Sequence, residues 1–169
     1  FIVKLFPEIT IKSRPVRNRL IQRLRSNLKT ILQRIDPQIK TNSFWDRIDI
    51  TCPDTAHVHY ESIASALACT PGISHCLEVH EYQLTNFDDI LGHVIRVYGE
   101  RIKGKRFVVR VKRSGKHDFS SHQLECDLGA GLLAQTSAGQ VDLHNPEVTV
   151  SVEIKDHQLF IVERRIEGL

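Results

Sequence analysis

Apolar residues recur along the first third of the chain at spacings that predict a strand followed by a long helix. Residues 1–6 alternate apolar and polar side chains, as a half-buried strand does. An apolar stripe of helical period then runs over residues 16–35. Ser13 is the expected N-cap, Pro15 suits the first turn, and Asp36-Pro37 ends the helix.

The pattern continues with shorter elements that complete a recognisable order. Further strands are predicted at residues 39–44, 47–51 and 75–82, and a second helix is predicted at 58–69. Thr70-Pro71-Gly72 stops that helix before the last strand begins. The order βαββαβ is typical of the ferredoxin-like unit.

A second unit follows the first. The spacing of Thr85 and Asp88 is that of a capping box, which predicts a helix over residues 87–98. Residues 106–113 form a β-rich run with three consecutive apolar side chains, so this strand is expected to be largely buried. Ser120 and Gln123 predict another capped helix, over 121–133, although two glycines weaken its second half.

The last part of the chain predicts a hairpin. Residues 147–154 and 159–163 alternate around a turn at 155–158. The second unit is therefore an α/β layer with a mixed sheet, and the chain as a whole is of the α+β class. We place the division between residues 1–82 and residues 83–169.

Charge is sorted along the chain far more strongly than the net charge of +3 shows. Residues 12–40 carry nine Lys and Arg against one acid, and residues 101–116 carry eight against none. Residues 41–100 instead hold two basic residues and nine acids. Such sorting indicates a polyanionic partner. A membrane surface is the weaker alternative, because the basic helix lacks the Trp- and Phe-rich face of an interfacial anchor.

Cysteine and histidine usage gives little support to catalysis or metal binding. The four cysteines form no C-x-x-C pair, and with no export signal or long apolar run we expect reduced thiols and a cytoplasmic location. His75 beside Cys76 is a candidate base and nucleophile, but neighbouring strand residues face opposite ways, which favours a structural role. His57 and His59 form a weak candidate metal pair without a third ligand.

The segment after the apolar run at 107–109 carries the strongest functional signal. Lys112, Arg113, Lys116 and His117 precede a capped helix, and Gly115 lies among them. A helix N-terminus presents backbone N–H groups and a partial positive charge. Cations placed before such a terminus predict a site for an anion, above all a phosphate.

Several motifs in order and spacing resemble the N-terminal half of the bacterial tRNA 4-thiouridine synthase family, also called tRNA sulfurtransferases. The resemblance covers essentially the whole chain. Its motifs are residues 7–13 with Arg17, then 70–75, 109–117, 141–150 and 165–168. One departure lies in the helix after the loop, where Cys126 and Ala130 stand in place of the family's Arg and one Gly.

The resemblance implies a ferredoxin-like domain followed by a THUMP domain that grips tRNA at its acceptor end and 3′ single strand. It further implies that 4-thiouridine formation at position 8 belongs to a later domain, which uses ATP with magnesium. The family's Ser-Gly-Gly-x-Asp-Ser loop is absent here, so we expect a piece of a longer protein without its own cofactor or catalytic residues. A cysteine desulfurase or other sulfur donor, a link to thiamine thiazole and a homodimer are implied for the full protein.

The expected RNA contacts come from three places. They are the loop, the strand before it and the start of the first helix, with Asn145 added as a base reader: Lys112, Arg113, Ser114, Lys116, His117, Arg110, Lys12, Arg17 and Asn145. Phe119 is expected to pack in the core in preference to stacking on a base. A ferredoxin-like regulatory module that binds a small anionic metabolite is the alternative, and it predicts weak salt dependence.

Overall fold

The computed structural model describes all 169 residues, and their contacts divide the chain into two compact units. Unit 1 comprises Phe1–Glu78 and Arg164–Leu169, and unit 2 comprises Val79–Glu163. Strands β4 (Ile73–Gln83) and β8 (Gln158–Glu167) each contribute residues to both units. These are units of packing, and the division of the sequence at 82/83 stays a prediction about domains.

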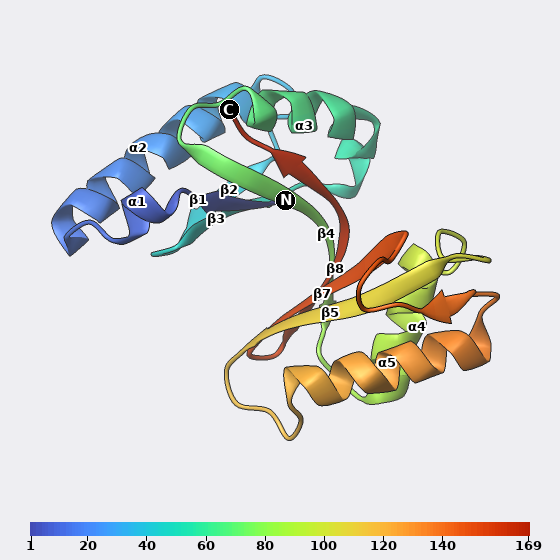
Figure 1. Cartoon of the computed structure of the whole chain (residues 1–169). Helices are drawn as coiled ribbons and strands as arrows, with labels where there is room; N and C mark the ends of the chain where they lie inside the picture. Colours follow the sequence, from blue (N-terminus) through green and yellow to red (C-terminus); the bar gives the residue numbers. More distant parts are fainter. The chain divides into compact units, whose positions relative to one another are not determined.

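Unit 1 has the predicted βαββαβ order (Figure 1). Its other elements are β1 (Ile2–Leu5), α1 (Pro7–Thr10), α2 (Arg14–Gln33), β2 (Lys40–Ser43), β3 (Arg47–Thr51), the 3-10 helix η1 (Asp54–His59) and α3 (Tyr60–Ala68). The strands follow the order β2-β3-β1-β4, and each neighbouring pair is antiparallel. This is the ferredoxin-like arrangement, and α2 and α3 cover one face of the sheet.

The long helix α2 is amphipathic, as its sequence predicts. Its apolar stripe is buried against the sheet through Ile21, Leu24, Leu28 and Leu32. Ser13 occupies the N-cap position, although its side chain makes no capping hydrogen bond. The basic side chains consequently lie on the faces of α2 that the core does not use.

Two details of unit 1 differ from the sequence prediction. The helix predicted at 58–69 is a 3-10 turn that begins after Pro53, followed by α3 from Tyr60. The four-residue helix α1 was not predicted, because so short a segment shows no periodicity. Pro7 stands in its first turn, and the Thr10 hydroxyl donates to the Pro7 carbonyl at 2.9 Å.

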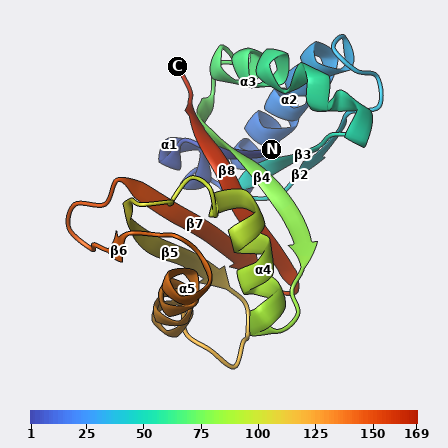
Figure 2. The ribbon, with the colours of Figure 1, turned by 90° about the vertical axis from the view of Figure 1, so that its right-hand side faces the viewer.

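Unit 2 holds two helices on one face of a mixed sheet (Figure 2). Its elements are α4 (Phe87–Tyr98), β5 (Arg106–Ser114), α5 (Ser121–Gln135), β6 (Gln140–Val141) and β7 (Val148–Lys155), together with parts of β4 and β8. β5 pairs in parallel with β6 and β7, whereas β7 and β8 form the predicted antiparallel hairpin. The predicted α/β layer with a mixed sheet is confirmed.

The core of unit 2 explains why α5 persists despite its glycines. Leu124, Leu128 and Leu132 are buried against the sheet. A Cβ on Gly131 would lie 2.7 Å from a methyl group of Leu91 on α4, so a larger residue there would have to displace the Leu91 side chain. Packing therefore offsets the poor helix propensity, and α5 runs two residues beyond its predicted end.

The predicted N-cap of α5 is confirmed, whereas the predicted N-cap of α4 is wrong by one residue. The Ser120 hydroxyl accepts from the Gln123 N–H at 3.0 Å, as predicted for α5. On α4 the cap is Asn86, whose side-chain oxygen accepts from the Asp89 N–H at 2.9 Å. Thr85 lies one residue too early to cap, and its hydroxyl donates to the Asp89 carboxylate instead.

No helix has the length and apolar character needed to cross a membrane.

Candidate nucleic-acid interface

The strand β5 fixes the start of the basic loop. Phe107, Val108 and Val109 are all buried, which confirms the prediction of a largely buried strand. β5 lies between β6 and β7 in the sheet, so both of its backbone edges are paired over part of its length. The loop that follows therefore leaves a rigid element at a defined point.

Residues on β5 alternate between two faces, and this separates cations that adjoin in sequence. The pairing of β5 with β7 continues through Ser114, so alternation holds over the whole strand. Arg110 and Lys112 share one face and are exposed. Arg113 shares the other face with Val111, on the side of the unit 2 core. Lys112 and Arg113, although adjacent in sequence, therefore point to opposite faces of the strand.

Arg113 and His117 brace the loop through hydrogen bonds. One terminal nitrogen of Arg113, Nη1, donates to the Gly115 carbonyl at 2.9 Å and lies 2.9 Å from His117 Nδ1. The other ring nitrogen of His117 lies 2.7 Å from the Asp156 carbonyl. Arginine only donates and a carbonyl only accepts, so His117 accepts at Nδ1 and donates at Nε2 as a neutral imidazole. Part of Arg113's donor set is thus used within the protein.

Gly115 is required by the turn that it makes. Its φ of +98° lies in the left-handed region that favours glycine, and a Cβ there would collide with the side chain of Asp156. The Asp156 N–H also donates to the Ser114 carbonyl at 3.0 Å. The loop is consequently seated against the turn between β7 and β8.

The far end of the loop is held by α5. The Glu125 carboxylate accepts from the Val111 N–H at 3.0 Å, which ties the second turn of the helix to β5. Phe119 is half-buried and packs against the unit 2 core, as expected, with its ring 5.3 Å from that of His117. The side chains of Lys112, Ser114 and Lys116 are exposed on this scaffold.

Asn145 lies away from that loop. Its carbonyl accepts from Arg106 Nε at 3.2 Å, at the opposite end of β5. Eight strand steps separate Arg106 from Ser114, which is about 26 Å. Asp142 accepts from the backbone N–H groups of Asn145 and His144, and these bonds lower the pKa of its carboxyl. The structure therefore does not bring Asn145 together with the loop.

The other two predicted residues, Lys12 and Arg17, lie in unit 1. Lys12 is exposed between α1 and α2, and Arg17 Nη1 donates to the Thr10 carbonyl at 3.3 Å. The Arg17 guanidinium carbon lies 5.9 Å from the centre of the Trp45 ring. Arg17 lines a hollow of about 410 Å³ together with Arg14, Asn18, Ile21, Gln22, Ser43, Phe44 and Trp45.

Sequence reasoning missed Phe44 and Trp45 as part of a site. The sequence did contain a clue to this site, namely two adjacent aromatic residues in a turn between short strands that follow a strongly basic helix. Only the fold shows that the turn between β2 and β3 lies next to the first turns of α2.

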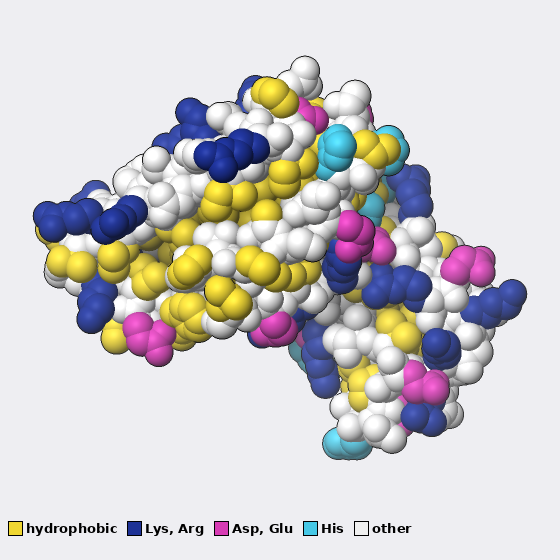
Figure 3. Space-filling view, turned by 90° about the horizontal axis from the view of Figure 1, so that it is seen from above, with side chains coloured by type: hydrophobic (Ala, Val, Ile, Leu, Met, Phe, Trp, Pro, Cys, Tyr) yellow, Lys and Arg dark blue, Asp and Glu magenta, His cyan; other side chains and the backbone are white.

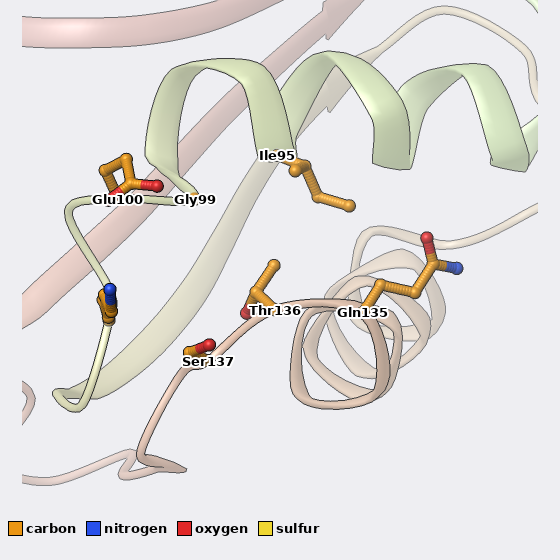
Figure 4. A pocket seen from close by; sticks show the side chains of 7 residues that line it. Ile95, Gly99, Glu100, Gln135, Thr136 and Ser137 are labelled. Atoms are coloured by element: carbon orange, nitrogen blue, oxygen red, sulfur yellow. The ribbon is translucent and has the colours of Figure 1, made fainter.

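A second hollow, of about 240 Å³, lies where α4 and α5 end (Figure 4). Glu100, Thr136 and Ser137 come from the segments after the two helices, and Lys103 also lines it. Helix C-termini carry partial negative charge. With a carboxylate added, this hollow does not suit a phosphate.

The cysteines have structural surroundings. Cys76 is buried in the unit 1 core, and that burial raises the pKa of its thiol to about 12. A thiol so hard to ionise is a poor nucleophile, as its predicted structural role requires. Cys126 is exposed on α5 with its sulfur 3.7 Å from His122 Nε2.

Comparison with known proteins matches both units. Residues 1–76 match the family model of the ThiI ferredoxin-like domain, and residues 85–162 match that of the THUMP domain. Among solved structures, the crystal structure of PH1313 from Pyrococcus horikoshii Ot3 aligns with 99% of this chain and 54% of its own, with a TM-score of 0.80 and 22% identity. A 4-thiouridine synthetase–RNA complex with bound ATP aligns over 99% and 41%, with a TM-score of 0.70 and 19% identity.

The class is thus a ferredoxin-like domain joined to a THUMP domain. Similar curated proteins are the tRNA sulfurtransferases of Shewanella sp. (strain MR-7), 46% identical over 169 residues, and of Pseudomonas paraeruginosa, 47% identical over 169 residues. They align with 100% and 99% of this chain, and the chain spans 35% of the length of each. The chain belongs to the tRNA sulfurtransferase family and represents its N-terminal region.

Proposed function

We propose that this chain is a tRNA-binding region that captures the acceptor end and 3′ single strand of tRNA. The observation that carries the proposal is the braced loop Lys112–His117 at the start of α5. Its exposed lysines stand on a framework fixed by β5, by the Asp156 turn and by the Ser120 cap. Phosphates bind most tightly to donors that need no reordering, so the framework favours a sugar–phosphate backbone.

Chemistry is assigned to the part of the parent protein outside this chain. We propose that the parent is an ATP-dependent enzyme, with magnesium, that forms 4-thiouridine at position 8 of tRNA and also serves thiamine thiazole sulfur transfer. The curated relatives carry the name tRNA sulfurtransferase, and no Ser-Gly-Gly-x-Asp-Ser loop occurs in these 169 residues. A cysteine desulfurase or another donor would supply the sulfur, and two copies would act together. This chain would contribute binding without turnover.

Arg110, Lys12, Arg17 and Asn145 have different places in this proposal. Arg110 shares an exposed face with Lys112, so both can follow one backbone. Lys12 and Arg17 would add charge from unit 1. Asn145 would act as a separate contact, since it lies at the far end of β5 from the loop.

A retardation assay with two RNAs tests the proposal. Whole tRNA and tRNA trimmed of its 3′ single strand are titrated against the chain at fixed salt, and binding to both is measured. We expect the trimmed RNA to bind more weakly. Equal binding of the two RNAs contradicts capture of the 3′ end, and no binding of either contradicts the proposed function as a whole. Incubation of the chain with ATP and a sulfur donor should yield no 4-thiouridine.

A further inference from the structure

The turn between β2 and β3 presents a tryptophan ring to solvent. Trp45 is 61% exposed and is the chain's single tryptophan. Its neighbour Phe44 is also exposed, at 42%, but one face of its ring lies against the guanidinium of Arg47, whose central carbon is 4.6 Å from the ring centre. Arg47 is in turn buried and donates to Asp49 at 2.7 Å. Arg47 therefore ties this turn to β3, and the Trp45 indole stands exposed beside it.

The wall opposite this ring is cationic and fixed. Arg17 is held by its bond to the Thr10 carbonyl, and its Nε is buried without a hydrogen-bond partner. The 5.9 Å between its guanidinium carbon and the Trp45 ring centre lies within the range of a cation–π contact. An indole face and a guanidinium plane are the two surfaces on which proteins stack unpaired bases.

The floor of the hollow joins α2 to β2. Gln22 Nε2 donates to the Ser43 hydroxyl at 3.0 Å, and Ile21 contributes a buried apolar surface. The volume of about 410 Å³ falls within the roughly 300–1,000 Å³ of small-ligand sites. Arg14 and Asn18 add donors at the rim, and no acidic residue lines the hollow. Asp46 follows Trp45 in sequence but is not among the lining residues.

The surrounding surface has the same character. Figure 3 shows dark blue Lys and Arg side chains beside yellow hydrophobic ones at its left-hand end, with magenta acidic atoms at the lower edge of that region. Apolar contact area with cations at its edge suits an RNA base attached to its phosphate. A paired duplex covers its base faces by stacking everywhere except at its two ends. A protein segment would need acids to match this rim.

We propose that the hollow lined by Arg14, Arg17 and Trp45 binds one unpaired RNA nucleotide. The base stacks on Trp45, and its phosphate is held by Arg14 and Arg17. This rests on the proposed function, because it assigns a second contact for the same RNA to unit 1. It places sequence-tolerant stacking there and leaves the braced phosphate contacts to the loop of unit 2.

Because Trp45 is the only tryptophan in the chain, the fluorescence of the protein reports directly on this site. The chain is titrated with three ligands: a five-nucleotide single-stranded RNA, the same backbone without bases, and an RNA duplex long enough to stay paired and to bind mainly away from its ends. We expect the single strand to quench Trp45 fluorescence with saturation. The abasic strand and the duplex, at matched fractions bound, should leave it unchanged. Equal quenching by the abasic strand overturns base stacking.

Variants give the affinity test. Labelled single-stranded RNA should bind Trp45→Ala about 5- to 150-fold more weakly, the range for losing one base–aromatic stack. Trp45→Phe should recover most of that affinity, and Ile11→Ala should bind as the unchanged chain, since Ile11 is 79% exposed and lies outside the hollow. Circular dichroism verifies the fold. Unchanged affinity of Trp45→Ala overturns the inference.

Whole tRNA separates this inference from the proposed function. If the chain retards tRNA but Trp45→Ala has no effect on any RNA, the stacking site fails and the proposed function stands. If the unchanged chain retards no RNA at all, the proposed function itself fails.

Discussion

The loop Lys112–His117 and the hollow beside Trp45 are both basic, yet they are built in opposite ways. In the loop, arginine is turned inward as a brace and lysines face solvent. In the hollow, arginine lines the wall and faces an exposed ring. Fixed point charges suit phosphates wherever they lie, whereas a ring with a planar cation suits a base. Equal charge in a sequence therefore conceals two different kinds of recognition.

Breaking the loop's turn should have the largest effect. Gly115→Ala places a Cβ into Asp156 at a left-handed φ, so we expect unfolding free energy to fall by about 1–3 kcal/mol or more. Gly104→Ala is the matched control, because its φ is also positive, at +67°, but nothing lies within 4 Å of the added atom. Chemical denaturation measures both. Equal losses would show that backbone strain alone matters and that the Asp156 contact does not.

Removing the brace should cost affinity in an RNA-dependent way. Arg113→Ala is expected to weaken tRNA binding by about 1–3 kcal/mol, the range for a charge-assisted hydrogen bond, and mainly for tRNA that keeps its 3′ single strand. Arg23→Ala on α2 should weaken all RNAs evenly and by less. Retardation assays on intact and trimmed tRNA compare the two variants.

Two controls distinguish the loss of the Arg113–His117 contact from the loss of one positive charge. Lys112→Ala removes one charge from the other face of β5 and leaves the Arg113–His117 contact in place. Circular dichroism confirms that each variant is folded. If Arg113→Ala loses the same free energy on both RNAs, the loop does not read the acceptor end.

Salt should weaken binding to a moderate degree. With roughly five or six phosphates contacted, the slope of log K against log[salt] should be about −4, using the single-strand coefficient. Trp45→Ala should leave the slope unchanged while lowering the affinity, because stacking releases no counterions. A slope near zero for the unchanged chain would favour a small anionic ligand over RNA.

The smallest expected effect is on thiol labelling. Cys126 on α5 and Cys69 in unit 1 are both exposed, so both should react with a thiol reagent. Bound tRNA should slow labelling of Cys126, which lies one turn beyond the loop's helix start, more than that of Cys69. Cys76, with its pKa raised to about 12 by burial, should react only on unfolding. Mass spectrometry gives the three rates, and equal shielding of Cys126 and Cys69 would contradict contact near α5.

Local patterns predicted what depends on local chemistry. The apolar run in β5 and the Ser120 cap needed only neighbouring residues, and both are found as predicted. The cap of α4 was wrong by one residue, because Thr85, Asn86 and Asp89 offer competing hydrogen bonds. Alternation along β5 would have separated Lys112 from Arg113, had strand geometry been applied to the loop's charges.

What escaped prediction depends on segments that are distant in sequence. The contact of Gly115 with Asp156 joins two turns about forty residues apart. The Trp45 hollow needs the start of α2 to approach the turn between β2 and β3. No periodicity encodes either approach, since both follow from how complete elements pack.

The interlock of Gly115 with Asp156 sets a condition on transplanting the basic loop to another scaffold. The conformation of the loop depends on two stretches of chain. His117 hydrogen-bonds to the Asp156 carbonyl, and the Asp156 N–H donates to the Ser114 carbonyl. Asp156 itself adopts a φ of 51°, within a tight two-residue hairpin turn. A graft of residues 112–117 alone would lose the hydrogen bonds to Asp156 that hold the loop in shape. The portable unit is the loop together with the 155–158 turn, and a lengthened turn in natural variants should be matched by changes in the loop.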